Sequence, residues 1–367
     1  MRVIMTGGGT GGHIYPAIAI ADKIKRKNPH AQILFLGTQR GMEKDLVPKG
    51  GYDIKFITVS GFNRKNLLKN FKTLKDLLKG SREARNILKE FMPDVVIGTG
   101  GYVCGPVVRE AYKMGIPTFI HEQNAIPGMT NKMLEPYVHK IFLSFEEASR
   151  FFKDKNKLVV TGNPLRKGFL ITSIQDNRVK LGIEPNEFVI LCFGGSRGAE
   201  RINSVVSEAV KTLIKVDGLR IYFITGRVYY DRIVSSINND GLDGGGRLTI
   251  LPYADNIQEY LSASDLVISR AGALTVSEIT ACGKASILIP SPNVTGNHQY
   301  YNGKVLEDKG AAVIVLEKDL SAEKLTDLVL KLKNNREGIN SMSAASASLG
   351  RVDAVDVIYE NLTFGTP

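Results

Sequence analysis

The 367-residue sequence contains no tryptophan and only three cysteines. Cys104, Cys192 and Cys282 are far apart and form no CxxC pair, so we expect neither disulfides nor a structural zinc site. Cys104 and Cys192 stand beside glycine-rich segments, where a reactive thiol is one alternative. We favour the other, small thiols that fill tight backbone turns.

Long apolar segments are also missing. No apolar run approaches the roughly 20 residues that span a bilayer. The N-terminus lacks the layout of a signal peptide, because Gly7 interrupts the first apolar stretch. We therefore expect a protein of the cytosol. No helix-turn-helix, RRM or zinc-finger pattern is present, so nucleic acid is not an expected partner.

Acidic residues are scarce in the first half of the chain. Residues 1–163 contain 26 Lys and Arg but 14 Asp and Glu, whereas residues 164–367 contain 22 and 23. The whole excess of positive charge, +11 for the chain, therefore belongs to the first half. This asymmetry indicates an anionic partner there, such as a phosphorylated ligand or an anionic membrane surface.

Short, almost wholly apolar runs recur along the chain with helical segments between them. They cover residues 3–5, 33–36, 95–97, 118–120, 140–143, 189–193, 221–225, 248–251, 266–268, 286–289 and 312–315. Such runs are typical of buried parallel strands, and their alternation with helices predicts an α/β fold of doubly wound parallel sheets.

The two halves of the chain begin alike, which predicts two tandem Rossmann-like domains. Each half starts with an apolar strand that leads into a glycine-rich loop and then a helix. We place the boundary in the Pro- and Gly-containing segment 161–166 and expect a second crossing in the Ser/Ala-rich stretch 341–349. The predicted domains are residues 1–163 with 343–367, which includes a returning C-terminal helix over about 352–362, and residues 164–342.

Three glycine-rich loops follow apolar strands, at residues 6–12, 98–106 and 194–198. Loops of this kind leave backbone N–H groups exposed toward a phosphate, and a helix N-terminus adds a favourable dipole. Tight packing alone is the alternative for each loop. None fits a P-loop, and the first lacks the acidic residue of a dinucleotide site, since Phe35-Leu36-Gly37-Thr38 stands there instead. Hydride transfer is therefore disfavoured.

The second half offers a further candidate at residues 269–278. Backbone N–H groups at the predicted helix start could bind a diphosphate together with Arg270, and Glu278 could accept the hydroxyls of a ribose. The alternative for Glu278 is a capping box with a Ser or Thr. Asn297-His298-Gln299, after a Pro-rich turn, suit sugar hydroxyls, although loop polarity alone also explains them.

A cluster of four polar residues, His121-Glu122-Gln123-Asn124, directly follows a predicted strand. Polar groups buried there must be hydrogen-bonded, which makes the cluster a candidate part of the site. HExxH and DxD patterns are absent, so we expect no metal and no cofactor.

The pattern of residues 65–79 predicts a basic amphipathic helix. Leu67, Phe71, Leu74 and Leu78 share one stripe, and Lys65, Lys69, Lys72, Lys75 and Lys79 fill the other side. Such a helix can lie on an anionic leaflet. Alternatively, the stripe packs on the sheet while the lysines face solvent.

Seven motifs carry a resemblance to a known family: TGGGTGGHIYPA (6–17), GTGGYVCGP (98–106), HEQN (121–124), GNPLR (162–166), GGSRGA (194–199), RAGALTVSEI (270–279) and NHQ (297–299). Over essentially its full length the chain resembles the GT-B glycosyltransferases that add N-acetylglucosamine to lipid I in peptidoglycan synthesis. The resemblance implies two Rossmann-like domains facing across a deep cleft. It implies an inverting transfer from UDP-GlcNAc to the muramyl 4-hydroxyl of lipid I, giving lipid II and UDP. It also implies a peripheral protein on the cytoplasmic face of the plasma membrane, with cell-wall and division complex proteins as partners.

The resemblance assigns the acceptor to the N-terminal domain and the donor to the C-terminal domain. The implied UDP-GlcNAc contacts are Thr10, Gly11, Gly12, Asn124, Arg166, Ser196, Ala254, Arg270, Ala273, Leu274, Thr275, Glu278 and Gln299. Gly9, Gly101 and Tyr102 are the expected contacts of the acceptor pyrophosphate.

Two residues compete for the role of the catalytic base that deprotonates the acceptor hydroxyl. His13 has a suitable unperturbed pKa of about 6.5 and lies on the acceptor-side loop, whereas Glu122 is the rival. A role for His13 in orienting the substrate is a further alternative. For the whole chain, the rivals are a diacylglycerol glycolipid synthase, a non-hydrolysing UDP-GlcNAc 2-epimerase and a nucleotide-sugar sensor without catalysis.

Overall fold

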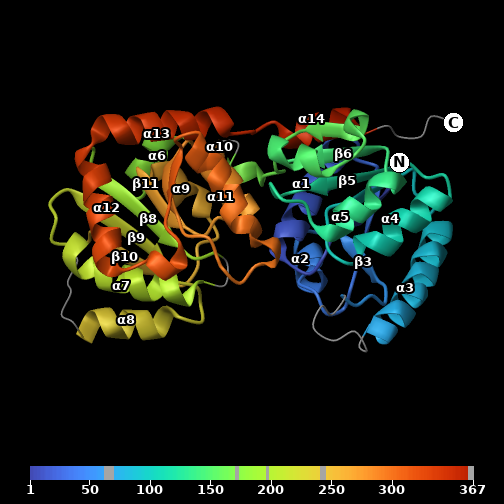
Figure 1. Cartoon of the computed structure of the whole chain (residues 1–367), viewed down its shortest axis with the longest axis horizontal. Coiled ribbons are helices and arrows are strands. Elements are labelled where there is room, and N and C mark those ends of the chain that lie inside the picture. Colours follow the sequence, from blue (N-terminus) through green and yellow to red (C-terminus); the bar gives the residue numbers. More distant parts are fainter. Residues whose placement is uncertain (62–69, 170–172, 196–197, 240–244, 363–367) are drawn as a thin grey trace. The chain divides into compact units, whose positions relative to one another are not determined.

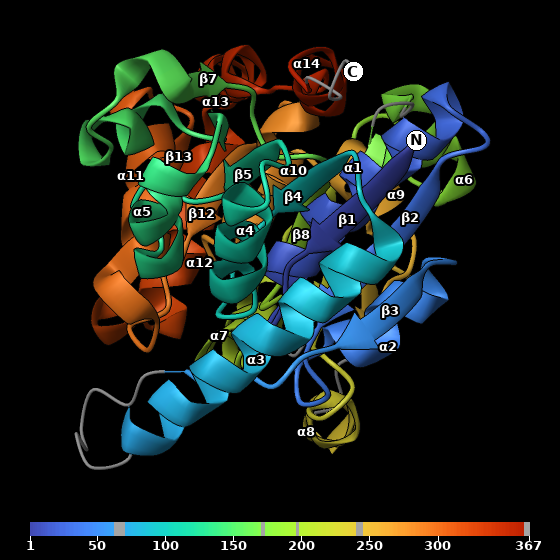
Figure 2. The same cartoon turned by 90° about the vertical axis from the view of Figure 1, so that its right-hand side faces the viewer.

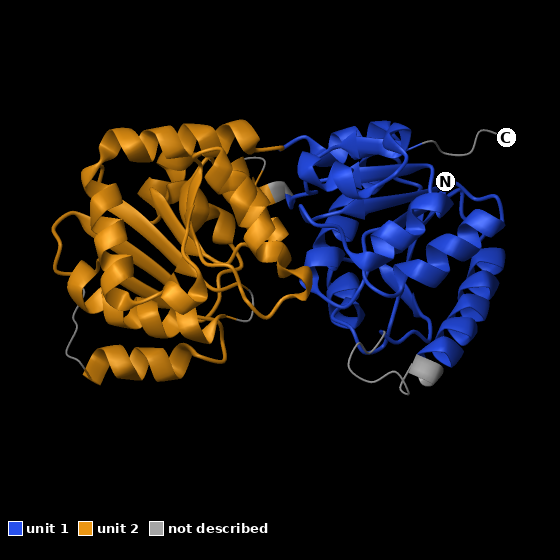
Figure 3. Cartoon of the chain, in the orientation of Figure 1, with its two compact units in different colours: residues 1–166, 352–367 blue, residues 167–351 orange. Residues whose placement is uncertain are grey.

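The computed structural model describes residues 1–61, 70–169, 173–195, 198–239 and 245–362 (Figure 1). It divides into two compact units (Figure 3). Unit 1 comprises Met1–Arg166 and Val352–Pro367, and unit 2 comprises Lys167–Arg351. The sequence predicted that the chain passes between the two domains at 163/164 and 342/343, whereas in the structure it does so at 166/167 and 351/352.

Unit 1 is built on a seven-stranded parallel sheet in the order β3-β2-β1-β4-β5-β6-β7. Its strands are β1 (Arg2–Thr6), β2 (Gln32–Gly37), β3 (Asp53–Phe56), β4 (Val95–Gly98), β5 (Thr118–Glu122), β6 (Lys140–Leu143) and β7 (Leu158–Val160). Its α-helices are α1 (Gly11–Lys27), α2 (Glu43–Lys49), α3 (Asn70–Phe91), α4 (Cys104–Lys113), α5 (Met129–Leu134) and α14 (Ala354–Glu360). Short 3-10 helices cover Glu135–Tyr137, Glu146–Phe151 and Lys155–Lys157.

Both faces of the unit 1 sheet are covered, as the apolar strands require. Val3 and Met5 of β1 point to one face, where Ile14 of α1 and Ile358 of α14 complete the core. Ile4 points to the other face, where α3, α4 and α5 pack. Figure 2 shows α3 running alongside α4 on that face. The C-terminal helix therefore belongs to the core of unit 1.

Unit 2 is built on a six-stranded parallel sheet in the order β10-β9-β8-β11-β12-β13. Its strands are β8 (Phe188–Phe193), β9 (Leu219–Ile224), β10 (Leu248–Leu251), β11 (Leu266–Ser269), β12 (Ala285–Leu288) and β13 (Ala312–Ile314). Its α-helices are α6 (Ile174–Lys180), α7 (Glu200–Leu213), α8 (Tyr230–Asn239), α9 (Ile257–Ala263), α10 (Ala273–Ala281), α11 (His298–Asp308), α12 (Ala322–Asn334) and α13 (Arg336–Leu349). Short 3-10 helices cover Lys167–Phe169, Thr295–Asn297 and Glu317–Asp319. Helices α7, α8 and α12 contribute to the core on one face of this sheet.

The doubly wound α/β fold predicted from the sequence is confirmed in both units. Two edge strands, β3 and β7, were not predicted. The residues of β3 alternate between apolar and charged, and β7 is a half-buried run of only three residues, Leu158–Val160. We expected the second crossing in the Ser/Ala-rich stretch 341–349, but these residues form the end of helix α13. Alanine is the best helix former, so this composition is compatible with a helix. The crossing itself follows at Arg351/Val352.

Candidate functional site

The first glycine loop connects β1 to α1, and it ends in the amino terminus of that helix. Thr10 is the N-cap of α1 and makes no side-chain capping bond, and α1 starts at Gly11. The first N–H groups of a helix have no partner within it. Gly9 adopts a left-handed φ of +87°, and a Cβ there would meet open space. The loop therefore ends at a helix start with backbone donors and a favourable dipole, an arrangement that suits an anion.

The second glycine loop packs directly on the first, because β4 is the neighbour of β1. Gly8 N–H donates to the Gly100 carbonyl at 3.2 Å. Gly101 has a φ of +86°, and a Cβ built there would stand 2.5 Å from the Gly8 carbonyl oxygen. Only glycine permits this close approach of two backbones. The expected acceptor residues Gly9 and Gly101 thus lie on two loops in contact, and the neighbouring Tyr102 is 60% exposed.

His13 lies in the first turn of α1 with one ring nitrogen already engaged. Its Nδ1 lies 3.1 Å from the Thr99 carbonyl oxygen and 3.1 Å from Gln123 Oε1. A carbonyl oxygen can only accept, so Nδ1 carries the hydrogen and the neutral ring has its lone pair on Nε2. An imidazole in this tautomer can take a proton at Nε2.

Glu122, the last residue of β5, is 1% exposed and accepts four N–H bonds. Oε1 accepts from the backbone and side-chain nitrogens of Asn124 at 3.0 and 3.1 Å. Oε2 accepts from Gly128 N at 3.0 Å and Asn131 Nδ2 at 2.8 Å. Both oxygens are therefore occupied in holding the loop between β5 and α5 in shape.

His121 is fully buried on the same strand, and its pKa is lowered to about 4. Burial is the main cause, and the neighbouring His13 lowers the pKa further, whereas the bond to Gly162 opposes both. Asn163 Nδ2 donates to the Gln123 carbonyl at 3.2 Å. The GNPLR segment is therefore tied to the polar cluster, and it ends at Arg166, whose guanidinium lies 5.5 Å from the Tyr15 ring centre.

Cys104 lies beneath the two loops as a buried thiol, as expected. Its Sγ donates to the Thr6 carbonyl at 3.1 Å, and burial raises its pKa to about 12. Cys192 is likewise buried with a raised pKa. Neither thiol is available as a thiolate at neutral pH.

The expected donor residues of unit 2 follow the carboxyl ends of its strands, where ligands of doubly wound sheets bind. The third glycine loop follows β8, and the Ser196 predicted in it lies outside the described residues. Ala254 follows β10, and it is half-buried. Gln299, at the start of α11, accepts from Ser291 N at 2.9 Å.

Helix α10 begins shortly after β11 and carries four of the expected donor contacts. Its N-cap is Gly272, so no side chain caps the helix. The first turn contains Ala273, Leu274 and Thr275, followed one turn later by Glu278. A capping box requires a Ser or Thr at the N-cap, so this alternative for Glu278 is wrong. The open helix start suits a diphosphate.

Arg270 lies between β11 and α10 and is already bound within unit 2. Its NH1 donates to the carbonyls of Ile289 and Pro290 at 3.2 and 3.3 Å, and its NH2 pairs with Glu317. A cavity of about 480 Å³ is lined by Pro290 and Glu317, together with Arg201, Asn297 and Leu316. No sequence pattern indicates Glu317 as a partner of Arg270, because it lies 47 positions further along the chain, in the short 3-10 helix Glu317–Asp319.

Glu43 is another residue that the sequence analysis missed. It is 1% exposed, and its carboxylate accepts from Gly9 N at 2.8 Å and Thr38 N at 2.9 Å. A Cβ at Gly8 would stand 2.6 Å from its Oε1. Glu43 therefore supports the first glycine loop from α2. The glycines that surround it, Gly37 and Gly41, were the available signal.

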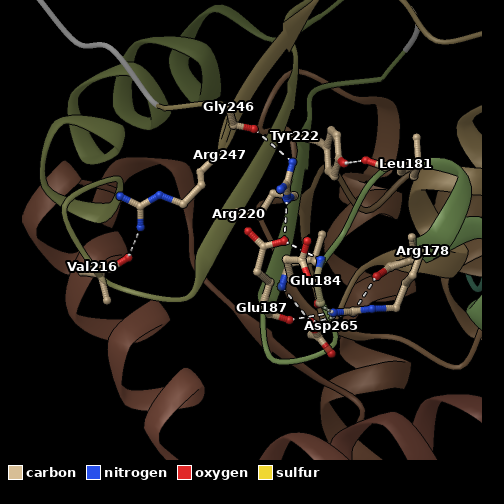
Figure 4. A network of polar contacts seen from close by, with 12 residues as sticks. Arg178, Leu181, Glu184, Glu187, Val216, Arg220, Tyr222, Gly246, Arg247 and Asp265 are labelled. Carbon is tan, nitrogen blue, oxygen red and sulfur yellow. Dashed lines mark hydrogen bonds and ion pairs between the residues drawn. The ribbon is translucent and has the colours of Figure 1, made fainter.

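Ion pairs lie at the amino ends of the unit 2 strands, opposite the end of the sheet where the glycine loop follows β8 (Figure 4). Arg178 pairs with Asp265 at 3.3 Å, and Arg220 with Glu187 at 2.8 Å. Burial opposes a charge on Glu187, but the hydrogen bond from Arg220 lowers its pKa overall. Because these charged side chains are paired with one another, we assign a structural role to them. Within the described residues, no three His, Cys, Asp or Glu side chains are grouped to hold a metal ion.

Comparisons with known proteins identify the family. Residues 3–143 match the glycosyltransferase family 28 N-terminal domain and residues 189–358 the glycosyltransferase family 28 C-terminal domain. The UDP-N-acetylglucosamine–N-acetylmuramyl-(pentapeptide) pyrophosphoryl-undecaprenol N-acetylglucosamine transferase of Thermoanaerobacter sp. (strain X514) is 48% identical, over 98% of both chains. The enzyme of the same name from Clostridioides difficile (strain 630) is 44% identical, over 99% of this chain and 88% of that protein.

Similarity to solved structures supports the same family. Acinetobacter baumannii MurG has a TM-score of 0.78 at 30% identity and 98% coverage of both chains. A UDP-GlcNAc 2-epimerase from Neisseria meningitidis has a TM-score of 0.68 at 14% identity, with 98% of this chain and 99% of that chain covered, which is a likeness of fold alone. The chain is a glycosyltransferase of the GT-B fold and belongs to glycosyltransferase family 28.

Proposed function

We propose that this chain transfers N-acetylglucosamine from UDP-GlcNAc to the muramyl 4-hydroxyl of lipid I, with inversion, forming lipid II and UDP. The proposal rests on the family and on the printed activity of relatives that match it nearly end to end. The single structural observation that supports it is His13, held with Nε2 unprotonated at the meeting point of two phosphate-type loops.

In the proposed reaction, Nε2 of His13 takes the proton of the acceptor hydroxyl while that oxygen attacks the anomeric carbon. The bond from the anomeric carbon to the diphosphate oxygen breaks, and UDP leaves with the electron pair. Unit 1 binds the acceptor pyrophosphate at the two glycine loops that contain Gly9 and Gly101, with Tyr102 beside them. The Gly9 N–H itself donates to Glu43, so the donors are the N–H groups at the start of α1. Unit 2 binds UDP-GlcNAc at the N-terminus of α10, where the dipole stabilises the leaving diphosphate.

The structure favours His13 over Glu122 as the base. Asn124, Gly128 and Asn131 donate four N–H bonds to Glu122, so a proton taken from substrate would displace at least one of these bonds. The two acceptors of His13 lie at Nδ1, so Nε2 can take up a proton without breaking either of these bonds. A positioned general base contributes about 10² to 10⁴ in rate.

The experiment measures UDP release from UDP-GlcNAc with and without a soluble lipid I analogue. We expect release only with the acceptor, and a His13→Ala variant slowed by about 10²-fold or more. The matched control is His30→Ala, since His30 is an exposed histidine at the other end of α1. UDP-GlcNAc turnover without acceptor would instead identify an epimerase, and an unchanged rate in His13→Ala would refute the role of the base.

We further propose that unit 1 binds the surface of an anionic membrane, the chemistry that a lipid-linked acceptor requires. None of the described helices is long and apolar enough to cross a bilayer. On α3, Leu74 and Leu78 are 51% and 60% exposed, beside the exposed Lys75 and Lys79. The core face of α3 is instead formed by residues such as Ala84 and Leu88, so these two leucines do not pack on the sheet. Leu67, Lys65 and Lys69 lie outside the described residues, as do the side chains of Phe71 and Lys72.

The membrane test is sedimentation with vesicles at low salt. We expect sedimentation with anionic vesicles and not with neutral ones, since each lysine near the surface contributes about 1 kcal/mol. Leu74→Gln and Leu78→Gln together are expected to weaken it. Val179→Gln, an exposed apolar residue of unit 2, is the control. A protein that stays in the supernatant with anionic vesicles would contradict the proposal.

A further inference from the structure

A continuous chain of hydrogen bonds connects His13 to the backbone of the GNPLR segment. His121 Nε2 lies 3.0 Å from the Gly162 carbonyl oxygen, and Gln123 Nε2 lies 3.0 Å from His121 Nδ1. Gln123 Oε1 then lies 3.1 Å from His13 Nδ1. All of these residues belong to unit 1, and His121 and Gln123 are at most 2% exposed.

The direction of every bond in this chain follows from two carbonyl oxygens, which only accept. The Gly162 carbonyl requires a hydrogen on His121 Nε2, so Nδ1 of the neutral ring accepts. The Thr99 carbonyl, 2.7 Å from Gln123 Nε2, requires the amide nitrogen to be on its side. The amide oxygen must then face His13, where it accepts from Nδ1–H.

We propose that Gln123 is a positioning residue that fixes the tautomer and the orientation of the His13 base, with the Gly162 carbonyl and His121 determining which way its amide faces. This deepens the proposed function and rests on it, because it presupposes that His13 Nε2 receives the proton. The amide of Gln123 cannot reverse its two ends without placing an N–H group against His13 Nδ1–H. The chain of bonds therefore keeps Nε2 as the basic nitrogen.

The same arrangement predicts how Gln123 acts on the imidazolium that forms during the reaction. Positively charged His13 donates from Nδ1 to two acceptors, the Thr99 carbonyl and Gln123 Oε1. Among the described residues, ionisable side chains on adjoining elements include His121 and Glu122 on β5, Cys104 on α4 and Glu43 on α2, and Tyr15 on α1 itself lies beside Arg166. His121 and Cys104 are neutral at neutral pH, given their shifted pKa values.

The first experiment compares pH profiles of kcat/KM for two substitutions of Gln123. Gln123→Met keeps the length of the side chain and removes the acceptor, so we expect kcat to fall about tenfold and the acid limb to move to lower pH. Gln123→Glu supplies a carboxylate acceptor that favours the imidazolium, so we expect the acid limb to move to higher pH. KM for UDP-GlcNAc should change less than twofold in both. Gln39→Met, at an exposed position of unit 1, is the matched control.

The second experiment reads the tautomer without substrate, so it can fail independently of the proposed function. In protein labelled with ¹⁵N-histidine, the His13 signals are assigned by their loss in His13→Gln. We expect a protonated Nδ1 and a bare Nε2 in the wild type, with exchange between tautomers in Gln123→Met. The proposal is overturned if His13 carries its hydrogen on Nε2, or if the acid limb moves in the same direction, or not at all, in both variants.

Discussion

Replacing Glu122 with glutamine tests whether this carboxylate holds a loop or performs chemistry. The substitution keeps the size of the side chain and exchanges one oxygen for an NH₂ group. Each oxygen of Glu122 accepts two N–H bonds. Whichever way the new amide faces, its NH₂ group therefore meets two donors, at Asn124 or at Gly128 and Asn131.

The size of the effect follows from the number of bonds. A hydrogen bond to a charged group contributes about 1.5–3 kcal/mol, so losing two costs about 3–6 kcal/mol. This is a large share of the roughly 5–15 kcal/mol that stabilises a typical domain. With a shift of about 2–4 °C per kcal/mol for a unit of this size, we expect Tm to fall by roughly 6–24 °C.

The assay is thermal unfolding followed by circular dichroism, with UDP release measured on the same samples below the transition. Glu146→Gln, an exposed carboxylate of unit 1, is the control and should change stability by less than about 0.5 kcal/mol. A Glu122→Gln protein with wild-type Tm and a kcat lowered by about 10²-fold or more would refute our reasoning and restore Glu122 as the base.

Three further predictions concern unit 1 and the cysteines. Gly101→Ala should nearly abolish UDP release, because its Cβ would collide with a backbone carbonyl, whereas Gly51→Ala, at a similar φ of +82° in open space, should cost only about 1–2 kcal/mol in stability. An unfolded histidine takes up a proton below about pH 6.5, whereas buried His121 does so only near pH 4, so the free energy of unfolding should fall by roughly 3 kcal/mol as pH drops through this window. Under native conditions at pH 8, iodoacetamide should label Cys282, which is partly exposed, and leave Cys104 unmodified, as peptide mass spectrometry would show.

Each of these has a result that contradicts it. Equal activity of the Gly101→Ala and Gly51→Ala proteins would mean that the two glycine loops do not need their close approach. His121→Asn should lose most of the pH dependence assigned to that residue in urea titrations, and an unchanged dependence would assign it elsewhere. Rapid labelling of Cys104 in folded protein would mean that the turn around it opens.

The sequence predicted those parts of the fold that depend on continuous apolar runs. Buried parallel strands such as β1 and β8 carry an unambiguous pattern, because both faces are covered. The edge strand β3 carries no such pattern, because it alternates between exposed and half-buried positions and includes Asp53 and Lys55. Composition also misled at residues 341–349, where the Ser/Ala-rich stretch was interpreted as the second crossing between the domains and instead continues α13.

At the candidate site, the sequence located the loops but not the contacts between them. The order β1-β4-β5 brings together segments about 90 and 25 residues apart, and no local pattern reports this adjacency. Glu122 was interpreted as a rival base because a carboxylate beside a strand end has the right chemistry, and its four donors become visible only in three dimensions. Gln123 was noted within a polar cluster, but its role depends on two carbonyls, at Thr99 and Gly162, that no side-chain pattern encodes.

The return of the chain to unit 1 has a consequence for synthesis on the ribosome. Ile358 and Leu362 are part of the same apolar core as β1, so that core lacks components until the segment that follows unit 2 has been translated. Unit 2 is encoded entirely between the two parts of unit 1 and has all of its strands and helices available earlier. Domains generally fold as units once they have emerged. Translation of unit 1 therefore begins before that of unit 2, but the packing of unit 1 is completed after that of unit 2.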